Sequence, residues 1–381
     1  MPIRIASFNV ENLFRRARVM NLATTAAARP ILDDINALQD LLARTIYSDE
    51  DKAAIKALLE KHNVEREELR PFFIQQVREK LYTLAKVQPA KKTLISRIKA
   101  GGRGDWDGWI ELERELVSEK AIENTARVIE TVNADVLCLV EAESRPALVE
   151  FDRRFLKSSR RYGRKMLIDG NDPRGIDVSL LSRFEIREMR SHVDDALPHS
   201  VAEPERLSQA HFARDCAEYE VRLPGGKSLW VLCNHFKSRG YGSKAGNDLK
   251  RVREALRVKQ ILQRFDLATQ FVAVCGDLNE LPGSASLAPL LTGTPKLRNV
   301  FDKLPAGALR WTHRDDAVPS QNDQIDYLLV SEALFAKCEK VEIERRGIFR
   351  PGKPASERFD TVTSNTTAAS DHAAVWAEFD L

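Results

Sequence analysis

Acidic, amide and imidazole side chains recur at the ends of apolar segments in this chain, and these residue types are the ones that hydrolytic sites use. Strand ends in packed sheets gather at one edge, where the loops build active sites. A single polar residue there would carry no information, but the repetition predicts a shared cleft. The residues at these ends are Asn9, Glu11, Glu141, Asn234, His235, Asp277, Asn279, Asp326, Asp371 and His372.

Two of these pairs have a spacing of two residues. Asn9 and Glu11 form one pair, and Asp277 and Asn279 form the other. Because side chains alternate between the faces of a strand, each pair can point two oxygen-bearing groups into one cleft. Hard oxygen ligands of this kind suit Mg²⁺ or Mn²⁺ better than a structural zinc ion.

This set of residues indicates the hydrolysis of a phosphodiester. That reaction needs a cation to neutralise charge on the phosphoryl oxygens, and carboxylates can hold it. An aspartate or a His–Asp pair can activate water, while Asn, His and Arg can stabilise the phosphate electrostatically.

The elements that must position these residues are short apolar strands. Continuous apolar runs are typical of strands that are buried on both faces. Helices are expected after Ser118 and at about 247–265, so the pattern predicts a layered α/β protein with central sheets covered by helices. The expected strands are Ile3–Val10, Val136–Val140, Val178–Leu181, Leu229–Cys233, Phe271–Cys275, Tyr327–Val330 and Ala374–Phe379.

The region 15–120 differs from the rest because it is polar and has almost no strand signal. Ser48 precedes an acidic first turn, as expected at the start of a helix, and the stretches 31–46 and 65–84 also look helical. We therefore predict a helical insertion. Trp106 and Trp109, in its glycine-rich loop, could stack on bases, but anchoring of the loop is the favoured interpretation.

Composition excludes few functions. The chain has 381 residues with a net charge of +3, which says little about its partners. Its five cysteines form no CxxC pair, so buried, reduced thiols are expected. No signal peptide or apolar run of about 18 residues is visible, so we expect a soluble, cytoplasmic protein with no membrane span and no obligatory protein partner.

Seven motifs in order resemble those of the endonuclease/exonuclease/phosphatase superfamily, which includes pancreatic-type deoxyribonucleases and apurinic endonucleases. They are SFNVENLF, CLVEAES, GIDVSLLSR, CNHFKS, CGDLNE, IDYLLVS and SDHAAVWAEF. The resemblance covers residues 1–14 and about 121–381. It implies a four-layer α/β sandwich of two packed mixed β-sheets flanked by helices, with 1–381 as a single domain and 15–120 as a helical insertion within it.

The resemblance also implies a metal site. Glu141 would be the principal ligand of a Mg²⁺ or Mn²⁺ ion, with Asn9 beside the metal. Glu11 would support the metal directly or through water, and Asp371 would be a further carboxylate on the metal side.

The remaining catalytic roles are implied in the same way. His235 would hydrogen-bond the scissile phosphate, and Asn279 would contact it. Asp277 would orient or deprotonate the attacking water. Asp326 would pair with His372, and this pair would act as a base or as a phosphate-stabilising imidazolium.

Three cations are candidates for substrate binding. Arg214, in FARDC, resembles the phosphate-binding arginine of the family. Arg174 could reach a substrate phosphate or belong only to the turn in DGNDPRG. Lys237 could continue the phosphate path or lie in a solvated loop. The other histidines are expected at the surface or in packing: His192, His199, His211 and His313.

The segment CNHFKSRG, with two cations after the histidine, resembles bacterial nuclease members, so DNA is the predicted substrate. The alternative is a phosphatase or phosphodiesterase that acts on a small or lipid phosphoester. The insertion could form a lid, a substrate-selecting wall or an oligomer interface.

Overall fold

The computed structural model describes residues 2–22, 25–87, 92–172, 174–196, 210–240, 243–314, 322–351 and 357–381. The chain divides into two compact units. The larger unit contains the first fifteen residues and nearly all of the chain after Glu115, and the smaller unit is built from Arg16–Glu115.

Two six-stranded sheets form the centre of the larger unit. The first sheet has the order β19-β20-β1-β8-β10-β9, and the second has the order β11-β12-β13-β14-β18-β15. Only the pairs β1–β8 and β13–β14 are parallel among these neighbours, so both sheets are mixed.

The seven predicted strands are all present, and β9, β11, β12, β15 and β19 were not predicted. In the first sheet the strands are β1 Ile3–Asn9, β8 Val136–Ala142, β9 Arg164–Leu167, β10 Asp177–Ser182, β19 Cys338–Glu344 and β20 Ala374–Phe379. In the second sheet they are β11 Glu185–Arg190, β12 Cys216–Arg222, β13 Ser228–His235, β14 Phe271–Asp277, β15 Arg298–Asn299 and β18 Asp326–Val330.

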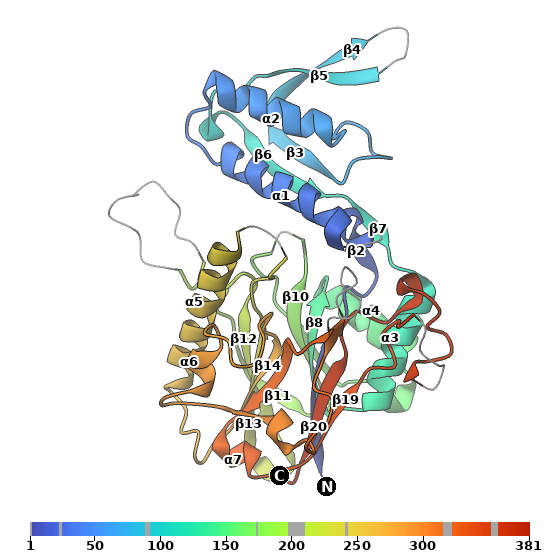
Figure 1. The fold of residues 1–381 in the computed structure, drawn as a ribbon, viewed down its shortest axis with the longest axis vertical. Coiled ribbons are helices and arrows are strands. Elements are labelled where there is room, and N and C mark those ends of the chain that lie inside the picture. Colours follow the sequence, from blue (N-terminus) through green and yellow to red (C-terminus); the bar gives the residue numbers. More distant parts are fainter. Residues whose placement is uncertain are drawn as a thin grey trace. The chain divides into compact units, whose positions relative to one another are not determined.

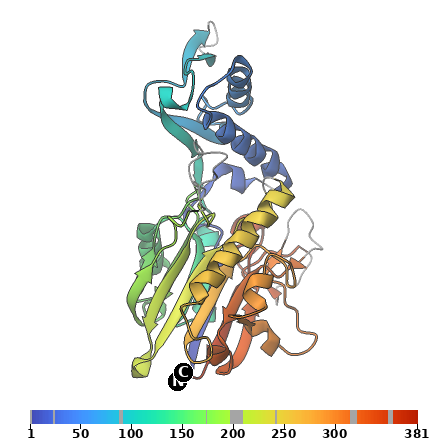
Figure 2. The ribbon, with the colours of Figure 1, turned by 90° about the vertical axis from the view of Figure 1, so that its left-hand side faces the viewer.

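Helices cover the outer face of each sheet. On the first sheet, α3 (Glu119–Val132) and α4 (Arg145–Phe155) share one apolar cluster with β1 and β8. On the second, α5 (Lys244–Leu262) and α6 (Ala288–Leu291) share another with β13 and β14. Figure 1 shows the order of the layers, and Figure 2 shows α5 running across the second sheet. The predicted four-layer α/β sandwich is confirmed.

The space between the sheets is filled by a single apolar cluster that draws residues from both. Cys233 on β13 and Cys275 on β14 belong to this cluster. Two residues further on, His235 and Asp277 end their strands on the same face, because side chains alternate along a strand. The inner face of the second sheet therefore ends in an imidazole and a carboxylate. All five cysteines are buried and unpaired with one another, as predicted.

Short elements complete the larger unit. They are α7 Glu332–Phe335, the strands β16 His313–Arg314 and β17 Asn322–Asp323, and the 3-10 turns Ser158–Arg160, Pro224–Gly226, Val300–Lys303 and Asn365–Thr367. In the part of the chain that the structure describes, no helix has the length and apolar character needed to cross a membrane.

The smaller unit contains the two helices expected from its first half. These are α1 (Thr25–Leu42) and α2 (Asp49–Lys61). The Ser48 side chain accepts a hydrogen bond from the Asp51 amide at 3.1 Å, and Asp51 reciprocates, so the sequence signal for this helix start was correct.

The helix expected over 65–84 is wrong, because this stretch forms strands. Phe72–Arg78 (β3) pairs with Asp107–Leu112 (β6), and Tyr82–Val87 (β4) pairs with Lys92–Ile98 (β5). The insertion is therefore a mixture of helices and two-stranded sheets. A further short pair joins β2 (Arg15–Ala17) to β7 (Arg114–Leu116).

The two tryptophans of the insertion differ. Trp106 is buried and its indole N–H donates to the Tyr47 hydroxyl at 3.1 Å, so it anchors the loop as predicted. Trp109 is 52% exposed, and the anchoring interpretation is wrong for it.

Candidate active site

Five of the predicted residues come together at one edge of the paired sheets. Asn9, His235 and Asp277 are the last residues of β1, β13 and β14, and Glu141 is the penultimate residue of β8. Asp326 begins β18, which runs antiparallel to β14 and pairs with it through Asp277. Because the two parallel pairs end on the same side, their terminal side chains meet between the sheets.

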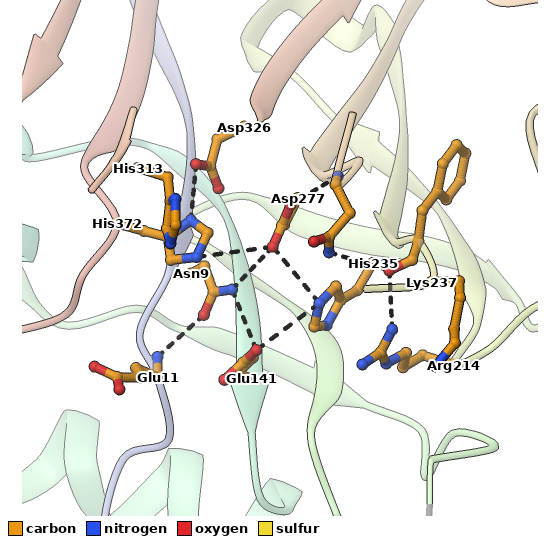
Figure 3. Close-up of polar contacts among 12 residues, drawn as sticks. Asn9, Glu11, Glu141, Arg214, His235, Lys237, Asp277, His313, Asp326 and His372 are labelled. Atoms are coloured by element: carbon orange, nitrogen blue, oxygen red, sulfur yellow. Dashed lines mark hydrogen bonds and ion pairs between the residues drawn. The ribbon is translucent and has the colours of Figure 1, made fainter. Parts of the chain in front are cut away.

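Asn9 lies at the centre of this group (Figure 3). Its Nδ2 donates to Glu141 Oε1 and to Asp277 Oδ2, each at 3.3 Å. Glu141 belongs to the first sheet and Asp277 to the second, so Asn9 connects carboxylates from both. Asn9 and Asp277 are buried, whereas the Glu141 side chain keeps 16% exposure. Of the two carboxylates, Glu141 is thus the more exposed to solvent.

His235 adds an imidazole to the same cluster. Its Nε2 lies 3.6 Å from Asp277 Oδ2 and 3.8 Å from Glu141 Oε1. Burial and the positive charges of Arg214 and Arg174 lower the pKa of His235 well below its usual value. The ring is therefore neutral at neutral pH and can donate one hydrogen bond to a substrate oxygen.

His372 has the opposite electrostatic setting. Its Nδ1 lies 2.8 Å from Asp326 Oδ2, and its Nε2 lies 3.8 Å from Asp277 Oδ2. Burial alone would lower the pKa of His372, but the charges of Asp326 and Asp371 outweigh it and hold this pKa well above the usual value. The site thus contains one neutral and one protonated imidazole, which face the same Asp277 carboxylate.

Asp277 is held in place by its own neighbours. Its Oδ1 accepts the backbone N–H of Asn279 at 2.8 Å, and Asn279 Nδ2 donates to the Phe236 carbonyl at 3.2 Å. Burial raises the pKa of Asp277; the charge of His372 opposes this rise, and that of Asp326 adds to it. A carboxylate with a raised pKa is a suitable group to accept a proton from water.

Left-handed backbone conformations cluster around the same residues. Glu11, Asn12, Glu141 and Asn279 have φ values of 51°, 69°, 67° and 51°. Such conformations cost free energy in residues other than glycine and are concentrated at functional sites. The Asn12 amide donates to the Glu141 carbonyl at 3.1 Å, which ties two of these strained positions together.

Gly276, directly before Asp277, permits a close backbone approach that no other residue would allow. Its φ is 134°, and an added Cβ would lie 1.8 Å from the Asn234 carbonyl oxygen. We expect Gly276→Ala to lower the free energy of unfolding by about 3 kcal/mol or more, as measured by urea denaturation. Gly163→Ala is the matched control, because no atom lies within 4 Å of its added Cβ. Equal stabilities for the two variants would contradict the role given to Gly276.

Two of the predicted substrate-binding cations, Arg174 and Arg214, contact the Asp172 carboxylate, and Lys237 follows His235 by two residues. Arg174 forms two hydrogen bonds to this carboxylate, at 2.9 Å and 2.7 Å, and Arg214 Nε lies 2.9 Å from Asp172 Oδ2. Burial would raise the pKa of Asp172, but the charges of Arg174 and Arg214 hold it well below its usual range. Arg214 is almost fully buried and also donates to the Phe236 carbonyl at 2.9 Å.

Lys237 shows that this group has an excess of positive charge. Burial, together with the charges of Arg214 and Arg174, lowers the pKa of Lys237 to about 8. The carboxylates of Asp172 and Glu254 oppose this lowering, so two carboxylates accompany the three cations. An anion bound here would be stabilised by three cations.

Glu11 and Asp371 are the two remaining carboxylates that were predicted to support the metal. The Glu11 backbone amide donates to Asn9 Oδ1 at 3.1 Å, while Figure 3 shows its carboxylate directed away from Asn9. Asp371 lies beside two histidines, with Oδ1 3.7 Å from His372 Nε2 and Oδ2 3.6 Å from His313 Nε2.

His313 is a residue that the sequence interpretation missed. It was expected at the surface or in packing, yet its ring centroid lies 4.7 Å from that of His372. An isolated β-bridge joins the two residues, so the contact depends on pairing between distant segments. No local pattern in WTHRDD indicated it. His199, placed in the same class by the sequence, lies outside the described residues.

The raised pKa of His372 leads to a pH prediction. If the protonated ring is needed, activity falls as pH rises through that pKa. Asp326→Asn removes the largest charge that raises this pKa, so the alkaline limb of the kcat/KM profile should move to lower pH. The profile can be measured with a phosphodiester substrate, and an unchanged alkaline limb in Asp326→Asn would contradict the assignment.

The larger unit is thus a layered α/β sandwich in which polar side chains from both sheets gather at one edge. The family model described as the endonuclease/exonuclease/phosphatase family matches residues 116–372. The chain belongs to this family, and its membership supports a phosphoesterase activity. Among curated proteins, no sequence matches this chain.

Solved structures with a similar fold have low sequence identity to this chain. Truncated TDP2 of Caenorhabditis elegans is 16% identical with a TM-score of 0.45, and 68% of this chain and 90% of that one are covered. A family member from Bacteroides vulgatus is 14% identical with a TM-score of 0.47 and the same coverage. The human Nocturnin catalytic domain with bound sulfate is 16% identical with a TM-score of 0.46, covering 69% of this chain and 86% of that one.

Proposed function

We propose that this protein is a divalent-metal-dependent nuclease that hydrolyses phosphodiester bonds of DNA. The observation that carries the proposal is the meeting of Glu141, Asn9 and Asp277 with two imidazoles of opposite charge state at one edge of the sheets. Each of these groups can take a role in phosphodiester hydrolysis. Asn9, His235 and His372 each have a nitrogen within 3.8 Å of Asp277 Oδ2, and Glu141 lies 3.3 Å from Asn9.

The residues fit a hard divalent cation. Glu141 and Asn9 offer carboxylate and amide oxygens, and none of the side chains drawn around them in Figure 3 carries a sulfur atom. Oxygen ligands of this kind are those that Mg²⁺ and Mn²⁺ prefer. We assign Glu141 as the principal ligand, Asn9 as its neighbour, and Glu11 and Asp371 as outer carboxylates. A bound cation would neutralise charge that develops on the phosphoryl oxygens.

The protein groups around the reacting phosphate divide the remaining work. Asp277 accepts the proton of the attacking water, and its raised pKa suits that task. His372, kept protonated by Asp326, stabilises negative charge on the phosphate, and neutral His235 donates a hydrogen bond to it. Asn279 holds Asp277 in position and lies at the same edge.

The cations Arg174, Arg214 and Lys237 support a substrate with more than one phosphate. They lie beside His235, which is the residue assigned to the scissile phosphate, and they retain an excess of positive charge. We assign them to a phosphate adjacent to the reacting one in a nucleic-acid chain. The same compact and largely buried group would also fit a small phosphoester, which is the second candidate substrate.

A substrate panel tests the proposal. Plasmid DNA, single-stranded DNA, RNA, bis-p-nitrophenyl phosphate and p-nitrophenyl phosphate should each be assayed with Mg²⁺, with Mn²⁺ and with EDTA. We expect cleavage of DNA and of the bis ester, loss of activity with EDTA, and recovery when Mg²⁺ or Mn²⁺ is restored. Hydrolysis of the monoester alone would favour the small-substrate candidate, and activity that survives EDTA would contradict the metal assignment.

A further inference from the structure

Positive charge is concentrated in one segment of the insertion. Residues 78–103 contain eight Lys or Arg residues and one acidic residue. This segment therefore carries a net charge of +7 in a chain whose total is +3, and the remaining residues carry a net charge of −4. The low overall charge thus conceals a strongly basic element.

The segment contains the β4–β5 hairpin, in which Tyr82–Val87 pairs with Lys92–Ile98 (Figure 1). The hairpin has one apolar face, because Tyr82, Ile95 and Ile98 are buried in the core of the smaller unit. That core also contains residues of α1 and α2. The described part of the hairpin is therefore packed against the rest of the smaller unit.

The basic side chains at the base of the hairpin are exposed and have no acidic partner. Arg78, Lys80 and Arg97 are all exposed. Within the described part of the chain, none of these three cations forms an ion pair with a carboxylate. Lys99 is the exception, since its Nζ lies 3.4 Å from Glu79.

Several other cations of the same unit are paired, although Arg29 and Arg103 form no ion pair among the described residues. Arg18 contacts Glu115 and Lys61 contacts Asp34, each at 2.6 Å. The further pairs are Arg44 with Asp51, Arg66 with Glu68 and Arg70 with Glu113. The positive charge of a cation without a carboxylate partner remains available to attract an external anion. The unpaired cations near the hairpin therefore indicate a surface that attracts a polyanion.

We propose that the β4–β5 hairpin with its flanking cations binds the sugar–phosphate backbone of a nucleic acid. The inference deepens the proposed nuclease function and rests on it for the identity of the polyanion. Contacts of Lys and Arg with phosphates are independent of sequence and release bound counterions. The hairpin thereby supplies affinity for the polymer, while the site around Glu141 supplies the chemistry.

The test is a charge-removal variant with a matched control. The test variant is Arg78→Gln/Lys80→Gln/Arg97→Gln, and the control is Arg187→Gln/Lys227→Gln/Lys337→Gln, which removes three exposed cations from the larger unit. Binding of fluorescent single-stranded DNA, duplex DNA and RNA should be measured in EDTA, which prevents metal-dependent cleavage. The salt concentration should be varied from about 50 to about 300 mM, a range over which phosphate contacts make the affinity depend strongly on salt.

The hairpin variant should bind about tenfold more weakly, and the slope of log K against log salt should become shallower by about one unit for each phosphate that the variant no longer binds. The control variant should keep the wild-type affinity and slope. Equal affinities for the hairpin variant and the wild-type protein, or equal weakening by the control variant, would overturn the proposal.

Two further measurements separate this inference from the nuclease assignment and from membrane binding. Hydrolysis of bis-p-nitrophenyl phosphate, which is not a polymer, tests the nuclease site alone. If this ester is not hydrolysed while DNA binding still depends on the hairpin, only the nuclease assignment is wrong. Vesicles of phosphatidylserine present the same negative charge on a lipid surface. If the hairpin variant loses vesicle binding but keeps nucleic-acid binding, the partner is a membrane and the proposal is wrong.

Discussion

Replacing Glu141 by Gln should lower kcat/KM for a phosphodiester by about a thousandfold or more, because the charge that holds the cation is removed. Glutamine keeps the size of the side chain and can still bond to Asn9, which lies 3.3 Å from Glu141 Oε1. The fold should therefore survive. Steady-state kinetics with bis-p-nitrophenyl phosphate at several Mg²⁺ concentrations would show whether the loss comes from weaker metal binding.

Glu185→Gln is the control for this experiment. Glu185 is an exposed carboxylate at the start of β11, so its replacement removes the same charge away from the strand ends that form the site. It should retain wild-type kinetics, and both variants should unfold at the wild-type temperature. Full activity in Glu141→Gln, or the same loss in Glu185→Gln, would refute the assignment of Glu141.

Replacing His372 by Ala should also reduce kcat by about a thousandfold, because it removes a preorganised positive charge from the phosphate site. The imidazole Nδ1 lies 2.8 Å from Asp326 Oδ2, and Asp326 is completely buried. Removal of the ring leaves a buried carboxylate without its partner, so some stability is lost as well. Urea denaturation of the same preparation would separate the two effects.

A double-mutant cycle sharpens this prediction. If Asp326 acts through His372, then Asp326→Asn in the His372→Ala background should cause little further loss of activity. His211→Ala is the matched control, since this substitution removes an imidazole from outside the cluster around Asp277. Additive losses in the double variant would show that Asp326 and His372 act separately, and normal activity in His372→Ala would exclude the proposed imidazolium.

The sequence predicted the strand ends at the candidate site well because the signal for a strand end is local. An apolar run followed by a polar residue marks both a buried strand and its end, as in VLCLVE and FVAVCGD. Strands β8 and β14 coincide with these runs, and Glu141 and Asp277 lie where the runs end. Strand ends in packed sheets gather at one edge, so a shared site was expected there. The packing of the two sheets, which brings Glu141 close to Asp277, could not be derived from these runs.

The errors concern contacts between distant segments. Residues 65–84 look helical because their apolar residues recur at roughly helical spacing. In the structure, however, Phe72 pairs with Leu112, forty positions away. A local pattern cannot report such a pairing. His313 was missed for the same reason, since it reaches His372 through an isolated bridge. The excess positive charge around Asp172 also depends on Arg174 and Arg214 being brought together by the fold.

The proposed chemistry depends on a divalent cation that binds beside Glu141 at the meeting point of the two sheets. A crystal grown with Mn²⁺, with anomalous data collected at the manganese edge, tests it directly. A cation held by Glu141 should give one strong anomalous peak within about 2.0–2.3 Å of a Glu141 carboxylate oxygen. A peak bound only by His313 and Asp371, or no peak near Glu141 at saturating Mn²⁺, would contradict it.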